Sequence, residues 1–495
     1  THTNEREDNK LSQSSSMELF VLYALLLLGL SVLFRRRRRS HTSRAPAAAV
    51  AIHKIMDPAV AHRALVENAD DFSNRPVPPF ITFLADSNGG RRGESLATAP
   101  YGPLWRAFRC NLTSETLHPS RLAYLAPLQR EAITDLVASL RLSAGEGAVS
   151  VRDDLYAAVF SVVARLCFGD GVDERHVRAM RYVIRDFQKY AVGEVRASPG
   201  SVRAKLAEWR RLRRLLALHR RMGELFLPLI AARRESRPPP CDGRRPYVDS
   251  LIDLRVPAAD GNHQAKEGEQ RGVREDEMVN LVSEFLGAGT GTVAACLEWA
   301  LAHLVNSQEV QKKLRGEVDG GGDAVSGGRS LIRGMPYLNA VVLETLRLHP
   351  QVSFVQRHVH GDAAAAVLGA TASGGDLFVK FTVGDIGRDK KTWKEAPDEF
   401  RPERFLPGGE GENVGPLPGP KEMKMMPFGA GHRFCPGVGL AMMNTKCFLA
   451  ALVREFEWTP PTDSEDFGGG VDLTELDTFV KLIKTPLSAR LTQRT

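Results

Sequence analysis

The chain is poor in cysteine, with only six in 495 residues. No two of them have the C-x-x-C spacing. Domains stapled by disulfides and structural zinc sites need cysteines in characteristic sets, so the scattered distribution argues against both classes. The six are Cys110, Cys167, Cys241, Cys296, Cys435 and Cys447. Any chemistry that cysteine performs in this protein therefore belongs to single residues.

An excess of one charge is also lacking outside one short run. Lysine and arginine number 66 against 59 acidic residues, and Arg35–Arg39 supply five of the resulting +7 charges (7 − 5 = 2). The remainder is nearly neutral, which argues against nucleic acid as a partner. Apolar residues form 43% of the chain, enough for a large core. No convincing linker or repeat divides the chain after residue 51, so one domain is expected.

Long apolar runs are missing except near the N-terminus. The run Leu19–Phe34 carries no charge, and at about 1.5 Å per residue it spans roughly 24 Å, against about 27 Å for the endoplasmic reticulum bilayer core. Arg35–Arg39 follow it, whereas the charges of a cleaved signal peptide precede its apolar run. We predict a single-pass endoplasmic reticulum anchor at 17–34, a basic linker at 35–46 and a cytosolic domain at 47–495. Residues 1–16 are expected to be a disordered upstream extension.

Hydrophobic periodicity predicts a mainly α domain with small β-sheets, an α+β class. Helical patterns cover residues 121–140, 155–168, 202–234, 278–305 and 436–453. Strand-like segments cover residues 49–52, 377–383 and 478–483.

The most specific segment is Phe428–Gly437, which reads FGAGHRFCPG and fits the pattern F-x-x-G-x-R-x-C-x-G. Each residue type has a use if Cys435 binds haem iron as a thiolate. Glycines such as Gly429 and Gly437 let backbone N–H groups approach the sulfur, and Arg433 can pair with a haem propionate. A helix starting after the cysteine favours the thiolate. The alternative is a glycine-rich loop around a buried structural cysteine.

With this segment the chain resembles the cytochrome P450 superfamily of haem-thiolate monooxygenases, most closely its plant microsomal members. The resemblance runs from about residue 51 to the C-terminus. It implies one large helical domain around haem b. Four further segments carry it: ETLR from Glu344 to Arg347 with FRPERF at 400–405, WRAFR at 105–109, GAGTGT at 287–292, and FSNRP at 72–76.

The E-x-x-R segment lies on a predicted helix that ends before Pro350. Glu344 and Arg347 are three residues apart and share a helix face. Taken alone, they could form an ordinary surface ion pair. The resemblance implies that both bind Arg404 of FRPERF in a network that supports the cysteine loop, and a buried network of this kind costs several kcal/mol to break.

Further haem contacts are implied by the resemblance. Trp105 and Arg109 lie four apart on a predicted helix, and their relatives meet the haem propionates through indole N–H and guanidinium. His358 matches a histidine near a propionate, although Arg357 stands where relatives usually have proline. By themselves Trp105 and Arg109 fit a helix with one inward aromatic residue and one solvated arginine.

The segment Gly287–Thr292 puts three glycines inside a long apolar helix, each costing about 1 kcal/mol relative to alanine. Small residues for helix packing are one explanation. The resemblance implies another, in which the groove at Ala288 and Gly289 holds dioxygen and the Thr292 hydroxyl helps to deliver protons. Most relatives carry an acidic residue where this chain has Gly291.

The resemblance therefore implies a monooxygenase that inserts one oxygen atom of O2 into a hydrophobic small molecule. Electrons would come from NADPH through a membrane-bound cytochrome reductase. Two alternatives remain open at this point: a haem-thiolate isomerase or dehydratase that needs no reductase, and a catalytically impaired haem-binding protein.

Overall fold

A computed structural model describes residues 52–87, 93–144, 147–192, 201–236, 245–258, 268–321, 334–369, 376–461, 470–476 and 478–494. Residues 52–495 form one compact unit. The predicted membrane anchor, the basic linker and the upstream extension lie outside the described residues.

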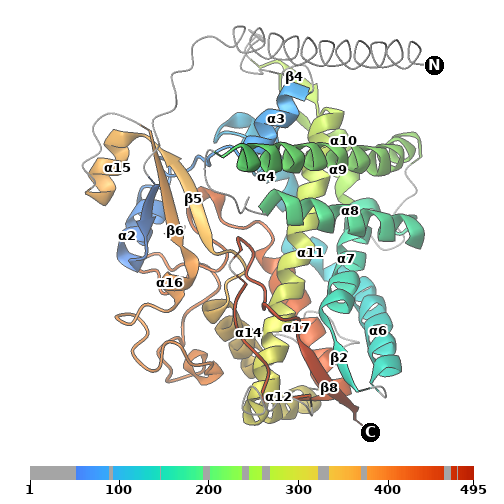
Figure 1. Cartoon of the computed structure of the whole chain (residues 1–495), viewed down its shortest axis with the longest axis vertical. Coiled ribbons are helices and arrows are strands. Elements are labelled where there is room, and N and C mark those ends of the chain that lie inside the picture. Colours follow the sequence, from blue (N-terminus) through green and yellow to red (C-terminus); the bar gives the residue numbers. More distant parts are fainter. Residues whose placement is uncertain are drawn as a thin grey trace, which may run out of the picture. The chain divides into compact units, whose positions relative to one another are not determined.

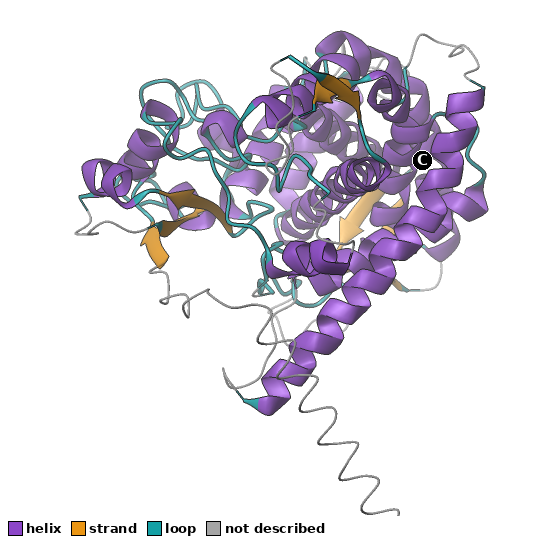
Figure 2. Cartoon of the chain, turned by 90° about the horizontal axis from the view of Figure 1, so that it is seen from above, coloured by secondary structure: helices purple, strands orange, loops and turns teal. Residues whose placement is uncertain are grey.

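Helices dominate the unit (Figures 1 and 2). The longer ones are α3 (Pro79–Ser87), α4 (Pro103–Asn111), α6 (Ala126–Ser143), α7 (Arg152–Phe168), α8 (Glu174–Val192), α9 (Val202–Glu235), α11 (Glu275–Asn306), α12 (Gln308–Gly320), α14 (Pro336–Leu348), α15 (Gly361–Leu368) and α17 (Val438–Glu455). The shorter ones are α2 (Pro58–His62), η1 (Arg63–Glu67), η2 (Leu112–Thr116), α5 (Pro119–Leu122), η3 (Ala123–Leu125), α10 (Tyr247–Asp253), α16 (Val383–Gly387), η4 (Pro402–Phe405) and η5 (Gly431–Arg433).

Three small sheets complete the unit. In the first, β1 (Ile52–Ile55) pairs in parallel with β6 (Leu377–Thr382), which pairs antiparallel with β5 (Phe354–Val359). The second has the order β2-β8-β7, from Ala148–Ser150, Ser488–Gln493 and Phe456–Thr459. The third joins β3 (Arg255–Pro257) to β4 (Gln270–Gly272). The first sheet lies to one side of the helical body (Figure 1).

The main hydrophobic core is built from α6, α7, α11 and α17, with residues such as Val163, Leu297 and Leu449 fully buried. Helix α11 runs through the middle of this body (Figure 1). Among the described residues it alone is long and apolar enough to cross a membrane, yet 78% of its apolar window is buried. Its apolar character is therefore that of a core helix.

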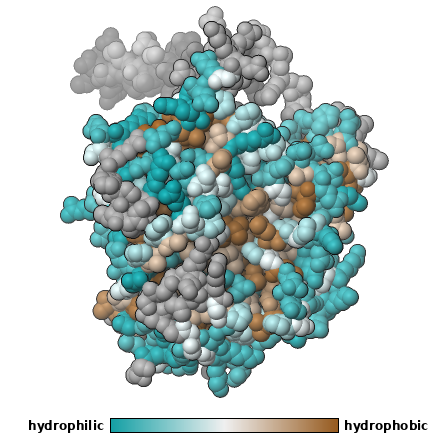
Figure 3. Space-filling view, turned by 180° about the vertical axis from the view of Figure 1, so that it is seen from behind, coloured by the Kyte–Doolittle hydropathy of each residue, from teal (hydrophilic) through white to brown (hydrophobic). Residues whose placement is uncertain are grey.

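Most predicted elements are confirmed within a few residues, and two predictions are wrong. Helix 121–140 is divided, because Pro127 starts a new helix at the first turn of α6 and the chain turns through η3 before it. Residues 478–483 form no strand and make only isolated bridges, Val352 with Val480 and Glu475 with Ile483. The face shown in Figure 3 is mostly hydrophilic, with hydrophobic residues visible near its centre and toward the right.

Candidate active site

Cys435 lies at the end of a tight loop directly before α17. Its backbone N–H donates to the Phe428 carbonyl at 2.8 Å, and the Gly437 N–H donates to its Sγ at 3.3 Å. Gly429 and Gly431 adopt φ of 73° and 69°, the left-handed region that favours glycine. A Cβ on Gly431 would lie 2.1 Å from the Leu65 carbonyl oxygen. The sulfur thus has the N–H donor and the following helix expected from the sequence.

Two opposing effects act on the pKa of the Cys435 thiol. Burial raises the pKa of Cys435, while the Gly437 N–H and the charges of Arg109 and Arg75 lower it. A metal cation bound to the sulfur would lower this pKa further, because a thiol that coordinates a metal loses its proton. Cys435 as a whole residue is half-buried.

Four arginines gather beside this loop: Arg75, Arg109, Arg357 and Arg433. Their hydrogen-bond acceptors are all backbone carbonyls. Arg433 donates to Ser73, Leu96 and Ala99 oxygens at 2.7–3.0 Å, and Arg109 donates to the Phe434 oxygen at 2.8 Å.

Acidic side chains act on the arginine cluster only from beyond ion-pair distance: the charge of Glu284 acts on Arg75 and Arg433, and that of Glu94 acts on Arg433. Arg357 donates to the Ala430 oxygen at 3.4 Å, but its buried Nε has no partner. Burial lowers the pKa of all four, and neighbouring positive charge lowers it further for Arg109, Arg357 and Arg433, the last to about 10. No carboxylate of the described residues lies within ion-pair distance of them. A ligand with two carboxylates next to a metal bound by sulfur fits this arrangement.

Trp105 and Arg109 lie one turn apart on α4. The Trp105 indole N–H donates to the Leu96 carbonyl at 3.2 Å, and the Arg433 guanidinium lies 4.7 Å from its ring centroid. Arg109 stacks on Phe434, 4.6 Å from the ring centroid. Arg109 is thus placed beside Cys435 as expected, whereas the indole N–H bonds a backbone carbonyl and supports Arg433 by cation–π contact.

His358 lies on the opposite face of β5 from the arginine cluster. Its Nε2 is 3.2 Å from Asp376 Oδ2, and its side chain is 39% exposed. The preceding residue, Arg357, is 1% exposed and faces the cluster with Arg75 and Arg433. Successive residues of a strand point to opposite faces, so only one of these two can face the cysteine loop. Arg357 therefore faces the cluster, and the role of His358 beside a propionate stays a prediction.

Sequence reasoning also missed Arg75, which lies in the FSNRP segment and donates to the Arg433 carbonyl at 3.4 Å. The signal for Arg357 was present in the sequence. It is a charged residue flanked at two-residue spacing by Val355 and Val359, which are apolar and share its face. A charge at such a position indicates a functional role more often than a solvated one.

The middle of α11 keeps open surface although the helix is otherwise buried. Ala288 is exposed, and Gly289, Gly291 and Thr292 are half-buried. The Thr292 hydroxyl donates to the Ala288 carbonyl at 2.8 Å. This back-bonding to the preceding turn is typical of a threonine that loosens a helix locally.

Two of the glycines in this segment serve helix packing. A Cβ on Gly289 would lie 3.1 Å from Val163 of α7, and a Cβ on Gly287 would lie 3.0 Å from the Gln188 amide of α8. The Gln188 amide donates to the Gly287 carbonyl at 3.0 Å. Small residues therefore bring α7 and α8 close to α11, while Ala288 and Thr292 lie at the open surface.

Glu344, Arg347 and Arg404 form a closed network. Arg347 donates to both Glu344 carboxylate oxygens at 2.7 and 2.8 Å, and Arg404 donates to Oε1 at 2.9 Å. Arg404 also pairs with Glu410. All three predicted residues are at most 3% exposed. The pair is thus buried, which excludes the alternative of a surface ion pair.

Trp393 connects this network to the segment before the cysteine. The guanidinium carbons of Arg347 and Arg404 lie 5.1 and 5.8 Å from its ring centroid. Its indole N–H donates to the Lys424 carbonyl at 3.0 Å. Residue 424 is eleven positions before Cys435, so the network supports the entry to the loop.

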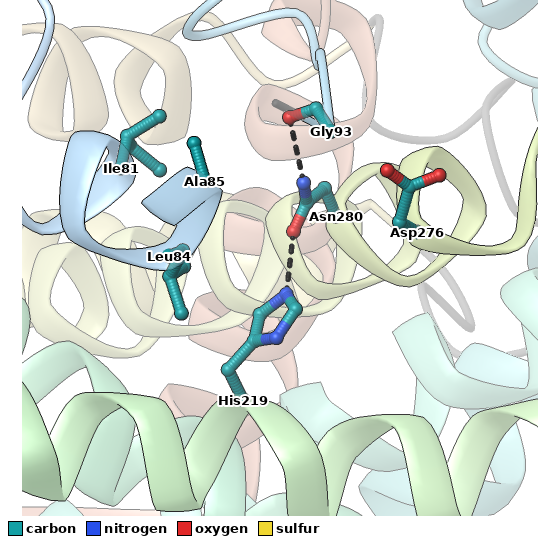
Figure 4. A pocket seen from close by; sticks show the side chains of 7 residues that line it. All are labelled: Ile81, Leu84, Ala85, Gly93, His219, Asp276 and Asn280. Atoms are coloured by element: carbon teal, nitrogen blue, oxygen red, sulfur yellow. Dashed lines mark hydrogen bonds between the residues drawn. The ribbon is translucent and has the colours of Figure 1, made fainter. Parts of the chain in front are cut away.

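A small pocket lies on the N-terminal part of α11 (Figure 4). Asn280 of α11 accepts a hydrogen bond from His219 of α9 at 2.8 Å and donates to the Gly93 carbonyl at 2.8 Å. Burial lowers the pKa of His219, which therefore stays neutral at pH 7. The pocket is closed by apolar residues of α3, among them Ile81 and Leu84. Asn280 thus ties the segment after α3 to α11.

A cytochrome P450 family model matches residues 47–472. The chain belongs to the cytochrome P450 family. Cytochrome P450 89A9 of Arabidopsis thaliana is 32% identical over 457 residues, 89% of this chain and 84% of that protein. A 2-hydroxyisoflavanone synthase of Glycyrrhiza uralensis is 29% identical, covering 79% and 72%, and a germacrene A hydroxylase of Helianthus annuus is 26% identical, covering 82% and 77%.

Solved cytochromes P450 share the fold. A zebra fish cytochrome P450 determined with progesterone has a TM-score of 0.71 at 21% identity, covering 93% of this chain and 99% of that one. This cytochrome P450 is accordingly a haem-dependent monooxygenase, an oxidoreductase that inserts one oxygen atom of O2 into a hydrophobic small molecule. The isomerase and the impaired haem binder are not favoured by these relatives.

Proposed function

We propose that Cys435 is the axial ligand of haem b and that the arginine cluster holds the two propionates. The observation that carries this assignment is a group of guanidiniums, two of them buried (Arg357 and Arg433), without a carboxylate within ion-pair distance, next to a cysteine with an N–H donor. Arg75, Arg109, Arg357 and Arg433 are the propionate-binding residues. Phe428, Gly429 and Gly437 shape the loop on the sulfur side, and Trp105 supports Arg433. When bound, the haem supplies oxygen activation and transfer.

Thr292 is the proton-handling residue in this proposal. Its hydroxyl donates to the Ala288 carbonyl and lies where α11 keeps open surface. Rotation of the hydroxyl would redirect its proton toward that surface. Because Gly291 supplies no carboxyl group, the proton on Thr292 Oγ1 must be replaced from water or from the substrate. Because Gly289 faces α7, we place the proposed dioxygen groove at Ala288 alone.

Electrons are proposed to come from NADPH through a membrane-bound cytochrome reductase, as the membership of the cytochrome P450 family and the plant relatives suggest. The N-terminal run at 17–34 is proposed to anchor the enzyme in the endoplasmic reticulum membrane, with residues 47–495 in the cytosol. The membrane would then hold reductase and monooxygenase on one surface.

The test is to express the full chain with a plant reductase and to record the ferrous carbon monoxide difference spectrum. A strongly red-shifted Soret band is expected, and NADPH-dependent consumption of O2 should accompany it. Cys435→Ser should abolish the shifted band completely while leaving the protein folded. A shifted band that persists in Cys435→Ser would contradict the assignment of the ligand.

Thr292→Ala separates haem binding from proton handling. This variant should keep the red-shifted band, since Thr292 makes no contact with the cysteine loop in the structure. It should convert less of the NADPH consumed into product and more into peroxide or water, by about tenfold or more. Unchanged product yield per NADPH would show that Thr292 does not handle the proton.

A further inference from the structure

Two buried histidines that the proposed function does not use contact each other at the C-terminal end of α11. His303 of α11 is 6% exposed, and His349, the residue after α14, is 5% exposed. Their Nε2 atoms lie 2.9 Å apart. His349 stacks on Trp299 with 3.7 Å between ring centroids, and His303 stacks on Phe400 at 4.1 Å. The stacking fixes the position of both rings, so the hydrogen bond of this histidine pair has one geometry.

A carboxylate decides where the protons of the histidine pair lie. Glu475 Oε1 lies 2.9 Å from His349 Nδ1. Burial raises the pKa of Glu475, but hydrogen bonds from His349 and Lys481 outweigh it and lower the pKa to about 2. At neutral pH Glu475 is therefore ionised and only accepts hydrogen bonds, so His349 Nδ1 carries a proton. The bare Nε2 of neutral His349 then accepts the N–H of His303.

The histidine pair can bind at most one extra proton while it stays closed. With one extra proton, a single N–H still lies between the two Nε2 atoms. A second proton would place an N–H on each Nε2, with the nitrogens 2.9 Å apart, and the hydrogen bond would be lost. Histidines that are separated and solvated both bind a proton below their ordinary pKa of about 6.5. Opening of the pair is therefore linked to the uptake of at least one proton at low pH.

The surroundings of the histidine pair disfavour even the first extra proton. Burial lowers the pKa of His303 well below its usual value, and the charges of His349 and Arg388 lower it further. Burial also lowers the pKa of His349, although the hydrogen bond with Glu475 opposes this change. Arg388, after α16, lies 3.4 Å from Glu475 Oε1, and the Lys481 ammonium lies 2.6 Å from Oε2. Two cations thus face the one carboxylate behind the pair.

The histidine pair also holds a distant part of the chain. Glu475 and Lys481 lie on either side of Phe479, which packs edge-on against Phe354 of β5 with 5.1 Å between ring centroids. Glu475 is bound to the pair through its carboxylate. The indole N–H of Trp299, the residue stacked on the pair, donates to the Lys481 carbonyl at 3.0 Å. The ends of α11 and α14 therefore hold both sides of the chain around Phe479.

We propose that the histidine pair is a proton-sensitive latch on the chain around Phe479. While the pair is closed, that chain is fixed to the ends of α11 and α14. When both histidines are protonated, the pair separates, and the chain is released together with the contact between Phe479 and Phe354. The latch consists of side chains of this protein and needs no haem, so its test does not depend on the proposed function.

The first test is the pH dependence of unfolding in urea, measured on the full haem-loaded chain. Unfolded histidines titrate near about pH 6.5 and the pKa values in the closed pair are lower, so the unfolded chain binds more protons. Stability is therefore complete above about pH 6.5 and is lost as the pH falls below it. Excluding one proton should raise the unfolding equilibrium constant about 30-fold between roughly pH 7.5 and 5, and excluding two should raise it further.

The decisive variant combines His303→Gln with His349→Gln, which removes both titratable rings and keeps amides that can hydrogen-bond. The 30-fold contribution should be missing from its pH dependence. His303→Gln alone is used if the double variant does not fold, because the amide can donate to or accept from His349 in either protonation state. The matched control is His62→Gln, since His62 is 4% exposed but binds Glu67 rather than a second histidine. The control should keep the pH dependence of the wild type.

The second test is amide hydrogen exchange of the full chain at about pH 7.5 and 5.5, corrected for the intrinsic effect of pH on exchange. Protection of the backbone around Phe479 should fall about tenfold in the wild type, whereas protection of α7 should not. The double variant, or His303→Gln in its place, should show no such fall. Equal pH dependence of unfolding in the wild type and the variant would overturn the latch. A loss of protection that is as large in α7 would also overturn it, because the pair would then only stabilise the whole fold.

Discussion

Two groups of arginines in this enzyme, each with buried members, differ in the carboxylates that lie within ion-pair distance. In the closed network, Arg347 and Arg404 both bind the Glu344 carboxylate, Arg404 also pairs with Glu410, and backbone carbonyls accept from other N–H groups of both arginines. In the arginine cluster beside Cys435, every acceptor is a carbonyl and no described carboxylate lies within ion-pair distance. The first group has its carboxylates within the described chain, and the second has none within ion-pair distance there.

This difference distinguishes arginines that stabilise the fold from arginines that are proposed to bind a ligand. A buried guanidinium requires compensation, and carbonyl dipoles supply only part of it. Glu344 supplies the rest in the closed network, which therefore stabilises the fold by itself. For the arginine cluster we propose that the compensation comes from a ligand, the two haem propionates. The same residue type thus performs two roles according to the anions around it.

The largest effect should come from removing the only shared anion of the closed network. Glu344→Gln leaves Arg347 and Arg404 buried beside a neutral amide, and we expect unfolding in urea to become easier by about 3–5 kcal/mol. Glu174→Gln is the matched control, because Glu174 pairs with Arg178 at an exposed site. The control should change the unfolding free energy by less than about 1 kcal/mol. Equal effects would show that burial does not distinguish the pairs.

Removing one charge from the arginine cluster should stabilise the haem-free protein but weaken the binding of haem. Arg357→Met removes a buried charge that Arg75 and Arg433 repel, so the haem-free protein should gain about 1 kcal/mol of stability. The loaded protein should lose haem about tenfold faster, because a charge-assisted hydrogen bond is missing. Urea unfolding of the haem-free chain and transfer of haem to an acceptor globin measure the two effects. Changes of the same sign would contradict a ligand-binding role for Arg357.

The smallest effect should come from the neighbouring His358. His358→Ala removes a half-exposed ring that faces Asp376 rather than the cluster. The haem transfer rate should stay within about twofold of the wild type, since exposed pairs contribute little. A loss as large as that of Arg357→Met would restore His358 as a propionate ligand and reverse the assignment of the two faces of β5.

Much of the fold was predictable because local signals agreed with the tertiary structure. The apolar period of residues 278–305 and 436–453 gave α11 and α17, and Glu344, Arg347 and Arg404 meet as expected. Prediction failed where the local pattern was ambiguous. Residues 354–359 alternate between two plausible faces, Phe354-Gln356-His358 and Val355-Arg357-Val359, and only the packing of the sheet against its core selects the second.

The sequence by itself determined the identity of the cysteine loop, the helical class and the closed network, because each depends on residue types at short and fixed spacings. The tertiary structure alone decided which arginines lack a carboxylate within ion-pair distance and which distant segment the Glu284 carboxylate binds. These properties depend on partners brought from distant segments, such as Ser95 to Glu284 and Ala430 to Arg357. Compensation of a buried charge is a property of its whole surroundings, and no spacing along the chain encodes it.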